Sequence, residues 1–165
     1  MNADFTKLVP EISKWDNGQG VSISSWIEMT GDYAHAVGYS VIFWPSFVEY
    51  NGCVFRSDVE DIDGWSKAYD GNRQIIESTA SHIHLRDLHL NDTEGNCPER
   101  LQYLASVLKE IYTCKLKLDF PEKSFIVEVC GEPDSPILLF YQEDNKTAEQ
   151  PGAGYPPQGV GSPDP

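Results

Sequence analysis

Residues 96–119 read NCPERLQYLASVLKEIYTCKLKLD and contain the clearest structural signal in the chain. Asn96 suits a helix N-cap, Pro98 the first turn and Glu99 the positive end of the helix dipole. The apolar residues that follow recur at helical spacing, and they are Leu101, Leu104, Ala105, Leu108, Ile111 and Tyr112. Lysines gather near the end of the stretch, and Pro121 prevents its continuation. The sequence therefore predicts a long central helix over about 98–119.

The segment after this helix has the composition of two β-strands. Phe125, Val127 and Val129 alternate with other residues, a Gly/Pro-rich cluster fills 131–136, and residues 137–141 read ILLFY. This pattern predicts an antiparallel β-hairpin over about 124–142. Because a two-stranded hairpin is marginal alone, we expect it to pack on helices.

Shorter helices are predicted upstream. Ser25 with Glu28, and Ser57 with Glu60, have capping-box spacing, the second opening a helix to about Tyr69. Asn72 suits the cap of a helix to about residue 81 whose inward side chains include Ile75 and Ile76. Residues 33–43 fit a helix with one apolar face, although 41–44 fit a strand equally, and that face holds Ala34, Val37, Val41 and Ile42. Asn51-Gly52 between two β-rich runs indicates a second hairpin.

These elements predict an α+β fold in which four to five helices surround the long helix and the hairpin packs across them. We expect residues 1–143 to form a single globular domain. Residues 144–165 are dominated by Pro and Gly and nearly lack bulky aliphatic side chains. Such a segment cannot bury enough apolar surface to offset its ordering entropy, so we predict a disordered tail.

The charge balance is strongly acidic. The 165 residues contain 26 Asp and Glu against 12 Lys and Arg, a formal net charge of −14. Binding to nucleic acid or to an anionic membrane surface needs clustered cations, so this balance argues against both. The first residues lack the pattern of a secretory signal and no apolar stretch is long enough to span a membrane. Four cysteines without C-x-x-C spacing then fit reduced thiols in a cytoplasm.

Aromatic residues are concentrated between positions 39 and 55. Packing in the core is the ordinary role of such residues. The alternative is an exposed anchor patch containing Trp44 and Tyr50, since Trp and Tyr are enriched at binding hot spots. The nearby carboxylates that such a patch could use for a basic protein partner are Asp58, Glu60 and Asp61.

Three of the four histidines fall within residues 82–92. His82 and His84 would project from the same side of an extended chain, and Asp87 or His89 could complete a metal site or orient an imidazole for acid–base chemistry. The spacing matches neither H-x-H-x-D-H nor H-E-x-x-H. The ordinary alternative is a strand or loop with partly solvated imidazoles.

With no catalytic motif, the sequence favours a small acidic cytosolic binding protein: an inhibitor, an antitoxin-like or immunity-like protein, or an adaptor. It is expected to act by protein–protein interaction on a basic partner and to need no cofactor or metal. The alternative is a small metal-dependent or His/Asp-based hydrolase that uses the 82–92 cluster.

Overall fold

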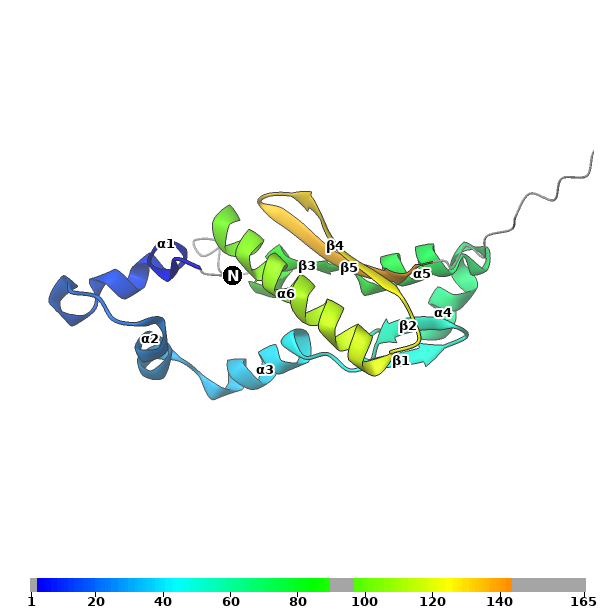
Figure 1. Ribbon diagram of the computed structural model, residues 1–165, viewed down its shortest axis with the longest axis horizontal. Coiled ribbons are helices and arrows are strands. Elements are labelled where there is room, and N and C mark those ends of the chain that lie inside the picture. The colour runs from blue at the N-terminus through cyan, green and yellow to red at the C-terminus, as the bar shows by residue number, and fades with distance from the viewer. Residues whose placement is uncertain (1–2, 90–96, 144–165) are drawn as a thin grey trace, which may run out of the picture.

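The computed structural model describes residues 3–89 and 97–143 (Figure 1). The α-helices within them are α1 (Phe5–Leu8), α2 (Ile23–Thr30), α3 (Tyr33–Phe43), α4 (Ile62–Lys67), α5 (Arg73–Ser81) and α6 (Pro98–Asp119). Short 3-10 helices are η1 (Pro10–Lys14), η2 (Asp16–Gly18), η3 (Ala68–Gly71) and η4 (Leu85–His89). The strands are β1 (Phe47–Tyr50), β2 (Cys53–Arg56), β3 (Ile83–His84), β4 (Phe125–Glu132) and β5 (Ser135–Gln142). Asn96 and the predicted tail 144–165 lie outside the described residues, and the N-cap of α6 is Cys97 and not the predicted Asn96, because Pro98 is already in the first turn.

The predicted α+β fold is confirmed, with α6 as its central helix. Its buried side chains repeat every three or four residues and are Leu101, Ala105, Leu108, Tyr112 and Leu116. They pack against Leu138 and Phe140 of β5 in the main core. Burying a large apolar side chain such as Leu108 is worth roughly 1.5–3 kcal/mol, so this helix–sheet contact stabilises the fold substantially.

Both predicted hairpins are present. Asn51 and Gly52 join β1 to β2 with φ angles of 50° and 79°, the left-handed values that a two-residue hairpin turn requires. The C-terminal hairpin has the predicted extent, but its turn is shorter than the predicted 131–136, because β4 continues to Glu132 and β5 begins at Ser135. The small strand β3 adds to the same sheet in the order β3-β5-β4. β3 falls in residues 82–92, for which the sequence left a strand or a loop open.

Two predicted helix starts are wrong. α2 begins at Ile23, with the Ser22 hydroxyl accepting a hydrogen bond from Ser25 N at 3.1 Å, so Ser25 is inside the helix. α4 begins at Ile62, where the Asp61 carboxylate accepts from Gly64 N at 3.1 Å. In both cases a neighbouring polar side chain satisfies the first turn in place of the predicted capping box.

The helix predicted after Asn72 is confirmed, but its inward face is different. Ile76, Glu77 and Ser81 are buried, whereas Ile75 is 43% exposed. α5 lies along β5 beyond the short β3, where the strand would otherwise have an open edge. The Ser81 hydroxyl accepts from Phe140 N at 3.0 Å and donates to Phe140 O at 2.8 Å. The face of α5 directed at β5 therefore includes polar side chains, which make the backbone hydrogen bonds that a neighbouring strand would otherwise make.

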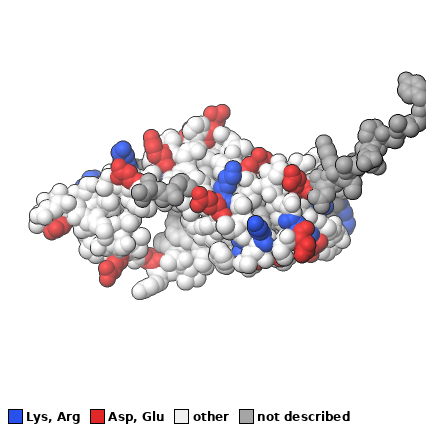
Figure 2. Space-filling model, viewed as in Figure 1, with Lys and Arg blue, Asp and Glu red and all other residues white. Residues whose placement is uncertain are grey.

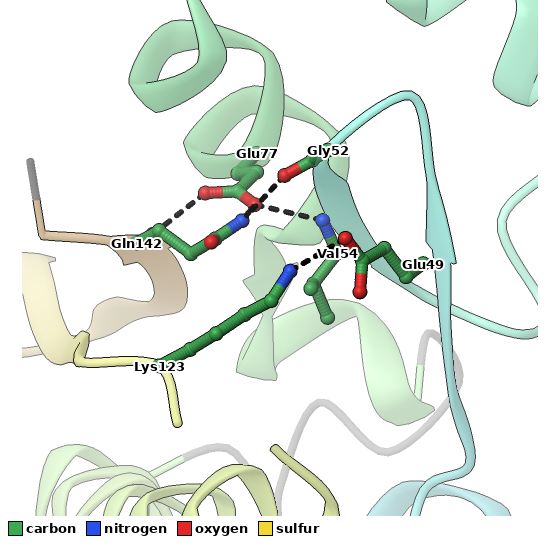
Figure 3. Close-up of polar contacts among 6 residues, drawn as sticks. All are labelled: Glu49, Gly52, Val54, Glu77, Lys123 and Gln142. Carbon is green, nitrogen blue, oxygen red and sulfur yellow. Dashed lines mark hydrogen bonds and ion pairs between the residues drawn. The ribbon is translucent and has the colours of Figure 1, made fainter. Parts of the chain in front are cut away.

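Glu77 makes the largest share of the side-chain hydrogen bonds that replace those of a strand here (Figure 3). Its side chain is fully buried, and its carboxylate accepts hydrogen bonds from Gln142 N at 2.6 Å and from Val54 N at 2.7 Å. The Gln142 side-chain amide donates both to Glu77 and to Gly52 O. One carboxylate thus joins α5, β2 and β5, and nearby Lys123 pairs separately with Glu49.

The N-terminal helices extend away from this core as a separate projection (Figure 1). We call residues 23–44, which comprise α2, α3 and Trp44, the α2–α3 arm, and residues 45–89 with 97–143 the body. The residues that precede the arm are held to α6 by Arg100. Arg100 Nε donates to Leu8 O at 2.6 Å, and its Nη2 contacts both Glu11 carboxylate oxygens at 2.7 and 2.8 Å. At the other end of the arm, Ile42 and Phe43 pack against the main core.

Candidate functional site

The apolar side chains of the α2–α3 arm are exposed or only partly buried. Neither α2 nor α3 contains a buried residue. α3 reads YAHAVGYSVIF and has apolar or aromatic side chains on every side. A helix of this kind is normally enclosed by protein. Within the described residues, its only partly covered side chains are Tyr39, Ile42 and Phe43, which leaves most of the helix in contact with solvent.

The outer face of α3 carries a regular apolar stripe. Val37 and Val41 lie four residues apart and are 70% and 52% exposed. Tyr33, one turn before Val37, is 93% exposed and also lines the neighbouring cleft. The helix predicted over residues 33–43 is present as α3, and Val37 and Val41 of its predicted apolar face are exposed. The side chains of α3 that pack against the main core are Ile42 and Phe43 at its end.

A cleft of about 800 Å³ lies on the inner side of the arm. It is formed by α2, by the turn into α3, by the first half of α3, and by η4 of the body. Its lining residues are Trp26, Ile27, Glu28, Thr30, Gly31, Asp32, Tyr33, His35, Ala36, Tyr39 and His89. The volume is within the usual range of ligand-binding pockets, roughly 300–1,000 Å³.

Tyr39 connects the cleft to the body. Its hydroxyl is hydrogen-bonded to His89 Nε2, and the two rings meet edge to face with centroids 5.6 Å apart. Phe43 packs edge to face on the other side of the same ring, at 6.0 Å. These contacts hold one aromatic wall of the cleft in place.

The charged residues of the cleft are all acidic. Of the described residues, Glu28 and Asp32 line it, and no Lys or Arg does. The sequence contains no Lys or Arg between Lys14 and Arg56, whereas it has Asp16, Glu28, Asp32 and Glu49 there. Figure 2 shows how charge is distributed on one face of the molecule. Basic and acidic side chains are mixed over the body, whereas the projecting end is mostly uncharged.

Asp32 is fixed at the start of α3. Its carboxylate accepts hydrogen bonds from Ala34 N at 2.6 Å and His35 N at 3.4 Å, and these bonds lower its pKa. His35 Nδ1 lies 3.4 Å from the other carboxylate oxygen. Asp32 therefore presents a negative charge at the mouth of the cleft at neutral pH.

The residues predicted as an aromatic and acidic binding patch are divided between two places. Trp44 is 57% exposed at the end of the arm, and Lys115 Nζ lies 5.5 Å from its ring centre. Tyr50 is 40% exposed at the opposite end of β1 and donates to Asp63.

Of the three predicted carboxylates, only Asp61 shares a surface with Tyr50. Both line a shallow hollow of about 390 Å³. Asp58 forms an ion pair with Arg56, which lowers the pKa of the Asp58 carboxyl. Glu60 is exposed.

The predicted histidine cluster is also divided. His82 and His84 do lie on one side, with ring centroids 5.0 Å apart. His82 Nδ1 contacts Thr79 O at the end of α5, while His89 is held by Tyr39 in the cleft, and Asp87 is exposed. Among the described residues, no three His, Cys, Asp or Glu side chains gather closely enough to hold a metal ion.

The cleft itself was not found from the sequence. Two signals could have indicated it: the lack of any Lys or Arg over residues 15–55, and an apolar pattern in 33–43 too evenly distributed for a one-faced helix. None of the described helices combines the length and apolar composition needed to cross a bilayer. No protein-family model, curated protein or solved structure gives a significant match to this chain.

Proposed function

We propose that the protein is a small acidic binding protein that acts by docking a basic protein partner on the α2–α3 arm. The observation that supports this most directly is the exposure of α3, a helix that is apolar on every side and has no buried residue. Exposed apolar surface of this extent marks an interaction site more often than chance composition. An inhibitor, an antitoxin-like or immunity-like protein, and an adaptor all work in this way.

The net charge supports a basic partner. A formal charge of −14 speeds the approach of a positively charged protein and disfavours nucleic acid or anionic membranes. Aromatic and aliphatic side chains of the arm then supply the contact area. All four cysteines are free, which fits action in a reducing compartment such as the cytoplasm.

The test is quantitative affinity capture from native lysate with matched variants. Val37→Ser with Val41→Ser removes two exposed side chains of the outer stripe, and Leu118→Ser removes one that is 66% exposed on α6. We expect the arm variant to retain less than about a tenth of a partner that the Leu118 variant retains in full. The association rate of that partner should fall as salt is raised.

If every captured protein is retained equally by the two variants, the arm is not the docking surface. An association rate that does not change with salt would remove the role of charge.

A further inference from the structure

We propose that the inner cleft of the arm receives an arginine or lysine side chain of the partner protein. This inference rests on the proposed function and specifies the chemical group that enters the site. The occupant is a cationic side chain of another protein. The test below distinguishes it from a second copy of this chain and from a purely apolar anchor.

The walls of the cleft suit a cation. Trp26, Tyr33 and Tyr39 line it, and aromatic ring faces attract ammonium and guanidinium groups within about 6 Å. Tyr33 is 93% exposed and therefore has a ring available for contact, while Tyr39 is fixed by Phe43 and His89. The methylene stem of an Arg or Lys can lie along Ile27 and Ala36 while its head stays among the rings.

The carboxylates complete the site. Glu28 and Asp32 line the same cleft with no Lys or Arg to neutralise them. Asp32 is oriented by the backbone of α3, since Ala34 N donates to one of its oxygens at 2.6 Å. A charge held in this way can accept a hydrogen bond from a guanidinium without a large ordering cost. The nearest positive group in the lining is His35, which is charged only when protonated.

Charge also argues against self-association through the arm. Two arms brought together would place two copies of Glu28 and Asp32 near each other, and neither arm contains a Lys or Arg. Like charges at an interface oppose binding. A chain with basic side chains beside apolar ones is the complementary occupant.

The probe is a pair of synthetic twelve-residue amphipathic peptides made of leucine and arginine, identical except that citrulline replaces every arginine in the second. Citrulline keeps the shape of arginine without its charge. Each peptide is titrated into the full-length ¹⁵N-labelled chain. We expect the arginine peptide to shift backbone amides of residues 26–39 and to bind at least about tenfold more tightly than the citrulline peptide.

Matched variants separate the cleft from the general acidity of the chain. Glu28→Gln with Asp32→Asn removes both charges and keeps an N-cap, since Asn caps helices as well as Asp. This pair should weaken the arginine peptide about tenfold. Glu110→Gln with Glu132→Gln removes two exposed charges of the body and should change binding less than about twofold.

Three results would overturn the inference. If both peptides bind the arm equally, the anchor is apolar, and docking on the arm still stands. If the two double variants weaken binding equally, the peptide is held by net charge alone. If residues 26–39 do not respond and the chain sediments as a dimer that Val37→Ser with Val41→Ser dissociates, the occupant is a second copy.

Discussion

The arm and the body differ in how composition relates to burial. α3, in the arm, is apolar on every side and has no buried residue, whereas Glu77, in the body, is a carboxylate with no exposed surface. Of the buried hydrophobic side chains in the described residues, only Ile12 precedes residue 45. Residue type alone therefore does not decide which surface is covered. In the body, backbone groups that need hydrogen-bond partners decide it, whereas in α3 of the arm the described residues cover little more than Tyr39, Ile42 and Phe43.

The physical reason lies in the edge of β5. An isolated strand edge exposes N–H and C=O groups that must be hydrogen-bonded when they are buried. Glu77 and Ser81 supply these bonds at Gln142 and Phe140. α2 and α3 satisfy most of their own backbone groups within each helix, and the side chains of α3 that contact the body include Tyr39, Ile42 and Phe43.

The largest expected effect comes from removing Glu77. Glu77→Ala leaves Val54 N, Gln142 N and the Gln142 amide without their acceptor in a site that water does not reach. We expect the free energy of unfolding to fall by about 3–5 kcal/mol. Urea denaturation followed by circular dichroism measures this change.

Glu110→Ala is the control, because it removes an exposed carboxylate of α6. It should change the free energy of unfolding by no more than about 0.5 kcal/mol. A Glu77→Ala protein as stable as this control would mean that the three donors find other partners, and the contrast between body and arm would lose its main support.

The same contrast explains what could be read from the sequence. α6 and both hairpins depend on local periodicity and turn residues, so their positions were predictable. The role of Glu77 was not, because a lone acidic residue in α5 reads as solvated until β5 is placed beside it.

The candidate site was predictable only in part. Trp44 is exposed as the anchor-patch alternative required, but Tyr50 lies elsewhere. His89 joins the cleft through Tyr39, fifty residues earlier, and no local pattern encodes that contact. Long-range contacts of this kind depend on the path of the chain between the elements. In the arm, α2 and α3 contain no buried residue that would fix this path.

A smaller effect is expected where the segment before the arm, residues 5–14, is attached to the body by Arg100 and Glu11. The Arg100 guanidinium holds the pKa of Glu11 below the ordinary 4.5, so this ion pair stabilises the joined state above about pH 4.5 and is lost as the pH falls through the lowered pKa. We expect residues 5–14 to lose protection from amide hydrogen exchange below that pH before the body does.

Arg100→Gln is the matched variant for this joint. At neutral pH it should already show the faster exchange of residues 5–14, and acidification should add little to it. The body should retain its denaturation midpoint, because a partly exposed ion pair contributes about 1 kcal/mol or less. Equal protection of residues 5–14 in both proteins at pH 7 would show that Phe5 on Tyr103 is sufficient to hold this end.

The smallest expected effect is on the stability of the arm itself. Val37 and Val41 are 70% and 52% exposed, so Val37→Ser with Val41→Ser exchanges side chains that remain largely in water. Although a core valine of this kind would cost several times more, we expect the free energy of unfolding to change by less than about 0.5 kcal/mol per site. Urea denaturation of the isolated chain measures this directly.

A loss above about 2 kcal/mol would mean that the outer stripe is covered within the free protein, and the surface offered to a partner would then be absent. Because the same variant is expected to lose its partner, a small change in stability beside a large change in capture is what separates a docking surface from a part of the core.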